Sequence, residues 1–300
     1  MKKKSSSVGV NRTLKASIRK YSPIFLLPTV IAFAIGFVWP FIWGVYLSFF
    51  RFNLIKDKSF VGFANYVGIF QDATFVHAFW VTALFAVIST IVINVIGFAL
   101  AYALTSKVKG TTVFRTIFFM PNLIGGIVLA YVWQQLLNQI IHSLYTSGVL
   151  GDPQLVSNPV YGIVCLIILV AWQQIGYMMI IYIAGLQNVP NDFIEAAKMD
   201  GANGWQILGK IIIPTIMPSI TICLFLSLTN GFKLFDQNFA LTQGKPNHLT
   251  ELLALNIYNS FYSSSSNRGF GQAKAVVFFV LVVVISLVQL AITKRKEVQQ

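Results

Sequence analysis

The sequence predicts an all-α, polytopic membrane protein with six transmembrane helices. Hydrophobic residues make up 56% of the 300 residues and charged residues only 10%, whereas a soluble globular chain usually carries about a quarter charged residues. The mean hydropathy is +0.72. The apolar residues come in runs that match or exceed the roughly 20 residues a helix needs to cross the hydrocarbon core. Only helices satisfy all their backbone hydrogen bonds in such runs.

Six apolar runs define one predicted transmembrane domain over residues 23–293. The spans are expected at 24–50, 81–105, 116–137, 160–186, 211–232 and 273–293. A basic tail, 1–22, precedes them and a short tail, 294–300, follows. The first run exceeds the roughly 7–15 residues of a cleavable signal's hydrophobic region, so we expect it to be retained. Helix-breaking residues predict kinks in the third and fifth spans, at Pro121 with Gly125 and Gly126, and at Pro214 with Pro218.

Lys and Arg are unevenly distributed among the connections. Fifteen of the 22 lie in the two tails and in the connections 106–115 and 187–210, and seven lie in the remaining connections. Connections rich in Lys and Arg favour the cytoplasmic side. Both termini and the 187–210 connection are therefore expected in the cytoplasm.

A short polar segment, 188–210, separates the fourth and fifth spans. Asp192 lies three residues before Glu195, a capping-box-like spacing that predicts the start of a helix. Gly201 offers a bend, and a second short amphipathic piece follows at 205–210. A helix, a bend and a helix held between two spans could pass force to a soluble partner.

Several kinds of chemistry are not indicated. The sequence has no Gly-x-x-x-x-Gly-Lys-Ser/Thr phosphate cradle, and its three histidines show no metal-ligand spacing. No acidic residue lies mid-span, which argues against a proton relay. The basic residues do not share one face with aromatic residues, so no nucleic acid partner is predicted.

We predict no catalytic residue, no metal site and no cofactor bound by this chain. A membrane-embedded transferase is the less favoured alternative, because the acidic residues are scattered.

Neutral polar and aromatic residues within or at the rims of the spans are candidates for a substrate pathway. Amides donate and accept hydrogen bonds, and aromatic rings stack on the apolar face of a sugar, so these residues suit a neutral polyhydroxylated solute. Hydrogen bonding between helices is the alternative, which we favour for Asn94 and leave open for the others. The candidates are Trp172, Gln173, Gln174, Tyr177 and Asn230.

The polar segment carries a family resemblance. Glu195-Ala196-Ala197-x-x-Asp200-Gly201-Ala202, followed by Trp205-Gln206-Ile207 and Ile211-Ile212-Ile213-Pro214, resembles the EAA loop of bacterial ABC importer permeases. Leu208 departs from the pattern, since members often have Phe there. Other stretches are similar to carbohydrate-uptake permeases of the maltose, multiple-sugar and raffinose type. They are Val61-Gly62-Phe63-Ala64-Asn65-Tyr66, Met120-Pro121, Phe235-Asp236 and Thr250-Glu251-Leu252-Leu253-Ala254.

This resemblance implies a type I importer fold and a subunit of a larger complex in the bacterial cytoplasmic membrane. The implied partners are a second homologous permease, two cytoplasmic ATPase subunits that bind ATP and Mg, and an extracellular sugar-binding protein. The loop would dock on the ATPase, and Asp236 joins the pathway candidates. The implied coupling residues are Glu195, Ala196, Ala197, Asp200, Gly201 and Ala202.

The implied cargo is a sugar, and in particular an oligosaccharide. A permease for glycerol phosphate or another small polar solute is the alternative. An anion carrier should place Lys or Arg within its spans, and the sequence predicts none there.

Overall fold

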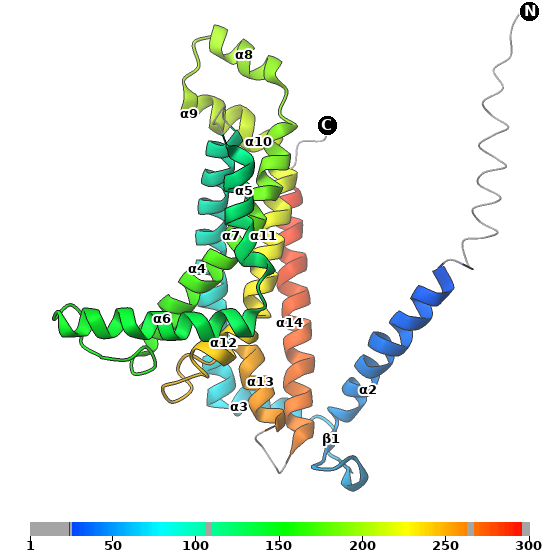
Figure 1. Ribbon diagram of the computed structural model, residues 1–300. Helices are drawn as coiled ribbons and strands as arrows, with labels where there is room; N and C mark the ends of the chain where they lie inside the picture. The colour runs from blue at the N-terminus through cyan, green and yellow to red at the C-terminus, as the bar shows by residue number, and fades with distance from the viewer. Residues whose placement is uncertain (1–23, 25, 106–109, 263–266, 296–300) are drawn as a thin grey trace, which may run out of the picture.

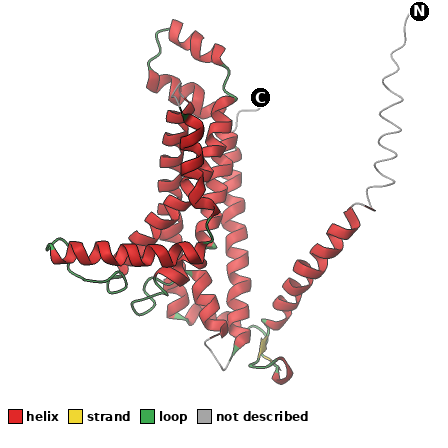
Figure 2. Cartoon of the chain, in the orientation of Figure 1, coloured by secondary structure: helices red, strands yellow, loops and turns green. Residues whose placement is uncertain are grey.

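A computed structural model describes residue 24 and residues 26–105, 110–262 and 267–295 of the chain. The predicted tail 1–22 and residues 296–300 of the second tail lie outside these residues. The described chain is mostly helical (Figure 2). Its one sheet is a short antiparallel pair, β1 (Phe50–Arg51) and β2 (Ser59–Phe60).

Four described helices are long and apolar enough to cross a membrane. The first, Leu26–Leu47, contains a π-helical turn, η1 (Ala34–Val38), and α2 (Trp39–Leu47). The others are α4 (Ala73–Thr105), α7 (Pro159–Gln187) and α14 (Arg268–Lys294). Two bent helix pairs pass the same test together, so counting each pair as one span gives the predicted six.

Both bends lie where the sequence predicts kinks. The first pair joins α5 (Thr111–Phe119) and η3 (Met120–Leu123) to α6 (Gly126–Thr146) at an angle of 100°. The second joins α9 (Gly204–Ile207), η4 (Leu208–Ile212) and α10 (Ile213–Thr215) to α11 (Met217–Phe232) at 73°. A single straight span at 116–137 is therefore wrong, because α6 turns away and runs across the bundle (Figure 1).

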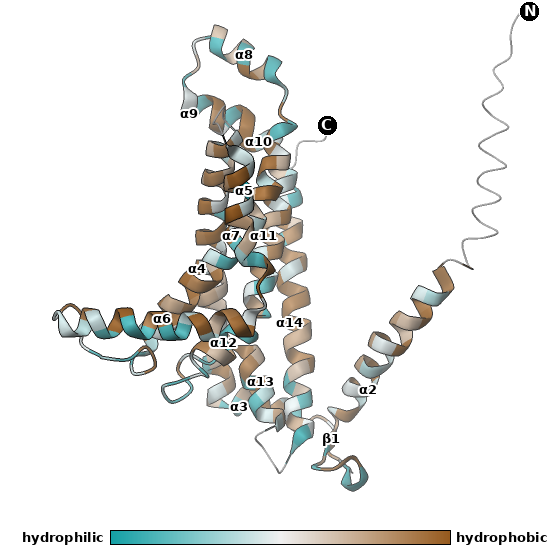
Figure 3. Cartoon of the chain, viewed as in Figure 1, coloured by the Kyte–Doolittle hydropathy of each residue, from teal (hydrophilic) through white to brown (hydrophobic). Residues whose placement is uncertain are grey.

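The bundle is built around α7. In Figure 1, α4, α5, α7, α11 and α14 run alongside one another, and α7 packs against α4, α5 and α11. Half of the most apolar window of α7 is buried, but none of that of α14, so α14 turns its apolar surface outward (Figure 3). Gly176 permits the close crossing of α7 and α5, because a Cβ there would lie 1.8 Å from the carbonyl oxygen of Phe118.

The two ends of the bundle differ. Beyond one end lies α8 (Asn191–Met199), and near the opposite end lie α3 (Ala64–Gln71), α12 (Asp236–Leu241) and α13 (Leu253–Tyr262) (Figure 1). We call these the α8 end and the α13 end. The α2 helix contacts α14. The helix Leu26–Leu47, which contains η1 and α2, diverges from the rest of the bundle, so its apolar side chains from Ile35 to Trp43 remain exposed.

Lys274 overturns the prediction that the spans contain no Lys or Arg. It lies in α14, and its side chain is only 2% exposed. The ammonium forms an ion pair with Asp72 at 2.7 Å and donates to Asn256 Oδ1 at 2.9 Å and Ser260 Oγ at 2.7 Å. Because Asp72 neutralises it, Lys274 is not a free cation for an anionic solute.

Acid should destabilise the α13 end through Asp72. Burial raises the pKa of this carboxyl, but hydrogen bonds and charge from Lys274, with hydrogen bonds from Thr74, outweigh burial and leave the pKa below its ordinary value of 3.8. The ionised form therefore contributes stability that is fully present above about pH 4 and is lost as the pH falls through the lowered value. We expect the thermal unfolding midpoint to fall more steeply in acid for the unmodified chain than for Asp72→Asn. Parallel pH profiles would contradict this.

Candidate functional site

The segment 188–210, called the coupling segment below, leaves the bundle at Asn188 and returns through α9. Its helix α8 begins at Asn191 after Pro190, which makes no side-chain cap bond. The capping box predicted at Asp192 and Glu195 is therefore wrong. A capping box instead starts α9, where Asn203 accepts from the Gln206 amide at 2.9 Å and Gln206 accepts from the Asn203 amide at 2.8 Å.

The predicted bend at Gly201 is confirmed. Gly201 has a φ of +78°, in the left-handed region that glycine occupies without steric cost. Its amide donates to Lys198 O at 3.1 Å, and the Ala202 amide donates to Ala197 O at 2.9 Å. These two bonds form a Schellman motif, which satisfies the last carbonyls of α8 and fixes the turn out of the helix.

The predicted coupling residues share one short stretch of backbone. Glu195 and Ala196 are exposed on α8, Ala197 is half-buried, and Asp200, Gly201 and Ala202 form its C-terminal turn. Within the described chain, neither carboxylate has an ion-pair partner. Both charges are therefore open to a partner protein.

Three large apolar side chains on the same segment are exposed, and sequence reasoning did not assign them to a contact surface. Phe193 is 59% exposed, Met199 88% and Trp205 83%. Exposed apolar groups rimmed by polar residues are typical of a protein interaction site. The signal was available in the sequence, as bulky apolar residues placed in an otherwise polar connection.

A cavity lies beneath α8. It measures about 630 Å³ and is lined by residues that include Phe193 and Ala197 on one side and Lys210 and Pro214 on the other. Figure 1 shows α8 arching over the end of the bundle. The exposed face of α8 is thus presented at a distance from the spans.

The pathway candidates on α7 do not share one face. Successive helical residues are about 100° apart, so Trp172 and Gln174 point in nearly opposite directions and Tyr177 lies on the side of Gln173 and Gln174. Trp172 is 42% exposed and packs against Trp133 of α6, with ring centroids 5.3 Å apart. The cluster predicted as one site is therefore divided.

The side chain of Gln173 connects the bend between η3 and α6 to α12, near the α13 end. Its amide donates to Ile124 O at 3.0 Å, and its carbonyl oxygen accepts from Gln237 at 2.7 Å. Asp236 precedes Gln237 at the start of α12 and lies against Gly126. Gln174 differs, because its Oε1 is buried and has no hydrogen-bond partner in the described chain.

The side chains of Asn94 and Asn230 differ in their hydrogen bonding. Asn94 donates to Thr90 O and Ser227 Oγ and accepts from Tyr182 at 2.7 Å, so the structural interpretation favoured for it is confirmed. Asn230 is half-buried on α11, and no hydrogen bond of its side chain is seen in the described chain. Among the described residues, no group of three or more His, Cys, Asp or Glu side chains is placed to hold a metal ion.

Comparison with known proteins identifies similar transporters. Residues 110–298 match the family described as binding-protein-dependent transport system inner membrane component. The probable starch degradation products transport system permease protein AmyD of Thermoanaerobacterium thermosulfurigenes is 40% identical, over 92% of this chain and 94% of that protein. The sn-glycerol-3-phosphate transport system permease protein UgpA of Brucella abortus is 30% identical, over 92% of this chain and 96% of that protein.

A solved structure has a similar fold. A chain of a bacterial ABC transporter involved in the import of the acidic polysaccharide alginate matches with a TM-score of 0.80 at 22% identity, over 94% of this chain and 99% of that chain. This likeness supports the type I importer architecture expected for the bundle.

Proposed function

Because the chain belongs to the family of binding-protein-dependent transport system inner membrane components, we propose that it is a permease subunit of an ATP-driven importer of neutral oligosaccharides. The coupling segment carries this proposal. It holds three carboxylates, those of Asp192, Glu195 and Asp200, that have no ion-pair partner in the described chain. They lie beside the exposed side chains of Phe193, Met199 and Trp205, at one end of an apolar bundle. Such a surface suits a soluble subunit that supplies the energy.

The partner at the coupling segment is a cytoplasmic ATPase subunit that binds ATP and Mg. Glu195 and Asp200 would make charged contacts with it, and the Schellman turn at Gly201 would fix the angle of α8. The distribution of Lys and Arg supports a cytoplasmic location for the α8 end. Helix Leu26–Leu47 begins toward that end and α14 finishes there (Figure 1), which agrees with cytoplasmic termini.

A second permease would pack against the apolar surface that the helix Leu26–Leu47 exposes. Ile35 is 68% exposed, Trp39 66% and Ile42 57%. Two such permeases, two ATPases and a sugar-binding protein on the outside would complete the transporter. Closure of the ATPases on ATP would draw the two coupling segments together and open the pathway outward. A ligand shifts this equilibrium only through its differential affinity for the two states.

A neutral sugar fits the polar groups better than glycerol phosphate or another anion does. Lys274, the buried lysine of α14, is neutralised by Asp72. The α7 candidates offer amides and aromatic rings, which are the groups that bind hydroxyls and sugar faces. The 40% identity to the starch-product permease, against 30% to the glycerol phosphate permease, supports the same assignment.

Uptake by the complete transporter tests the proposal. The chain would be reconstituted in vesicles with its partner permease, ATPases and binding protein, and supplied with labelled maltotetraose, raffinose or glycerol 3-phosphate. We expect ATP-dependent accumulation of an oligosaccharide. Accumulation of glycerol 3-phosphate alone would contradict the proposed cargo, and loss of uptake without ATP is the internal control.

Trp172→Ala should reduce sugar uptake about fivefold, because it removes an exposed ring worth on the order of 1 kcal/mol in stacking. The affinity of the binding protein for sugar should not change. Asn230→Ala tests the second candidate in the same assay. The matched control is Trp80→Ala, which removes a tryptophan that is 66% exposed on α4. Unchanged uptake in Trp172→Ala would assign Trp172 to helix packing with Trp133.

A further inference from the structure

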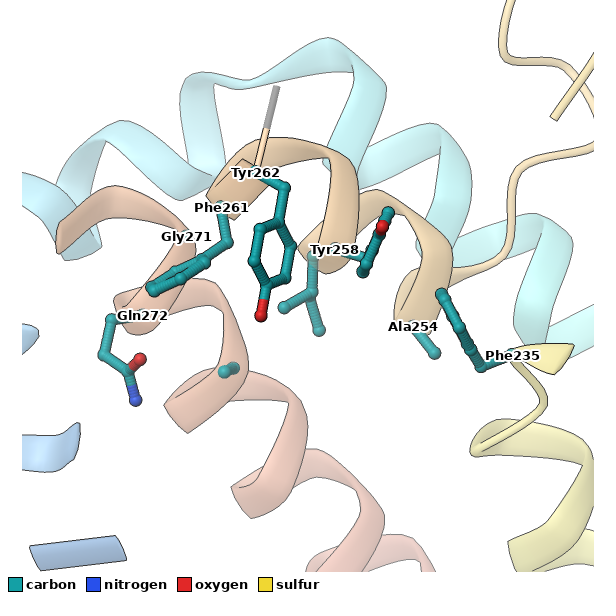
Figure 4. A pocket seen from close by; sticks show the side chains of 9 residues that line it. Phe235, Ala254, Tyr258, Phe261, Tyr262, Gly271 and Gln272 are labelled. Carbon is teal, nitrogen blue, oxygen red and sulfur yellow. The ribbon is translucent and has the colours of Figure 1, made fainter. Parts of the chain in front are cut away.

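An aromatic pocket opens between α13 and α14. It measures about 430 Å³ and is lined mainly by side chains of α13 and α14, with Phe235 at one edge. In Figure 4 the labelled side chains form a row from Gln272 through Phe261 and Tyr262 to Tyr258 and Phe235. The rings of this row follow one another at centroid separations of 5.1, 4.7 and 5.1 Å.

The chemistry of the lining indicates the class of ligand. None of the lining residues carries a charge. The hydroxyls of Tyr258 and Tyr262 and the amide of Gln272 have no hydrogen-bond partner in the described chain. A row of rings edged by free hydroxyls and an amide matches a ligand that has apolar faces and many hydroxyl groups. A cationic ligand is disfavoured, because Arg268 lies behind Phe261, 5.9 Å from its ring.

The pocket rests on a rigid support. Asn256, Asn259 and Ser260 lie on the inward side of α13, where Lys274 binds Asn256 and Ser260 and Asn259 donates to the buried Glu251 at 2.6 Å. Tyr258 and Tyr262 are one helical turn apart and lie on the other side of α13. The polar contacts therefore hold α13 so that its aromatic side faces the opening, with Tyr262 65% exposed.

We propose that this pocket is an external subsite for a neutral oligosaccharide, which binds sugar over Tyr258 and Tyr262 before it enters the span region. The proposal rests on the proposed function, since that function places the α13 end outside the cell, where the binding protein delivers its sugar. Phe235, at one edge of the pocket, directly precedes Asp236 and the Gln237–Gln173 contact. The subsite therefore adjoins the polar residues that lead to α7.

Uptake kinetics of the complete transporter test this subsite. Tyr258→Ala/Tyr262→Ala should raise the KM for maltotetraose or raffinose about tenfold, which corresponds to about 1.4 kcal/mol, with kcat little changed. Tyr258→Phe/Tyr262→Phe keeps the rings and should retain most of the affinity. Trp80→Ala is the control for loss of an exposed aromatic residue at the same end. An unchanged KM in the double alanine variant, while the unmodified transporter imports sugar, overturns the subsite alone; absence of uptake by the unmodified transporter overturns the proposed function.

Chemical labelling gives a second measurement that does not depend on transport. Tyr262→Cys in the complete transporter should react with a membrane-impermeant maleimide, and maltotetraose should slow this reaction while mannitol should not. The unmodified chain is the background control, because Cys165 and Cys223 are buried. An introduced thiol that does not react would show that lipid or the second permease covers the pocket, and a reaction that sugar does not slow would show that no sugar binds; either result overturns the proposal.

Discussion

Replacing Gly201 by proline is expected to abolish the coupling of ATP hydrolysis to sugar uptake while the transporter still assembles. Proline fixes φ near −65° and has no amide hydrogen, whereas Gly201 has a φ of +78° and donates to Lys198 O. The substitution therefore removes the Schellman turn that ends α8. The cost of about 3 kcal/mol or more is enough to depopulate the native turn more than a hundredfold.

The coupling ratio, sugar imported per ATP hydrolysed by the reconstituted transporter, measures this effect. Gly201→Ala should give an intermediate loss, because a left-handed alanine costs roughly 1–2 kcal/mol. Gly209→Ala is the matched control, since a Cβ at that position meets nothing within 4 Å and the backbone there is not left-handed. A wild-type ratio in Gly201→Pro would remove the coupling role from this turn.

Glu195→Lys separates charge from backbone geometry in the same assay. The Glu195 side chain is exposed, and no described residue forms an ion pair with it. Reversing the charge at this position should therefore leave the fold intact. We expect a loss of coupling comparable to that of the proline variant. If only Gly201→Pro uncouples, then the angle of α8 matters and the Glu195 charge does not.

The sequence predicted the class of fold and the positions of the kinks, because span length and proline are local properties. It could not predict where the chain goes after a kink. The direction of α6 depends on contacts such as Gln173 with Ile124 O and Gln134 with Leu241 O, at 3.0 and 2.7 Å, which join segments far apart in the sequence. A single apolar run of span length thus looked like one straight helix.

In the candidate site, too, local features could be predicted from the sequence and features that depend on distant residues could not. Gly201 was predicted correctly, since a glycine after a helical stretch is a local signal. The capping box was assigned to Asp192 and Glu195 although the same spacing at Asn203 and Gln206 was present. The division of Trp172 from Gln174 followed from helical geometry alone and could have been foreseen. Bulky apolar residues in a polar connection were a signal in the sequence, but the exposure of these residues and of the carboxylates needed the structure, because exposure depends on what the rest of the chain covers.

Lys274 was counted among the connections although the predicted span 273–293 includes it, and its burial could not be predicted because its partners are remote. It stands at the edge of an apolar run, where a lysine usually reaches the membrane surface. Asp72, Asn256 and Ser260 come from other elements, and together they make burial of the charge possible. No local pattern contains this information.

Lys274→Ala is therefore expected to be the most destabilising substitution at the α13 end. The Asp72 side chain is 21% exposed, so water partly solvates the charge left behind, and the cost should be about 2–3 kcal/mol, below the roughly 3–5 kcal/mol of breaking a fully buried ion pair. The substitution leaves the Asp72 carboxylate without its counter-charge and Asn256 and Ser260 without their donor. The rings of Phe75 and Phe270, which lie 5.5 and 4.9 Å from the ammonium, also lose their contact.

The thermal unfolding midpoint of the purified chain in detergent measures this cost, with Lys294→Ala as the control, because Lys294 is an exposed lysine at the far end of the same helix. Lys274→Met/Asp72→Asn should recover much of the loss, since it removes both charges and restores apolar volume. Equal midpoints for Lys274→Ala and Lys294→Ala would mean that water or lipid headgroups solvate the ammonium and that the cluster does not anchor α13. If the cluster does anchor α13, Lys274→Ala should also raise the KM for sugar, because Asn256 and Ser260 hold the helix that carries Tyr258 and Tyr262.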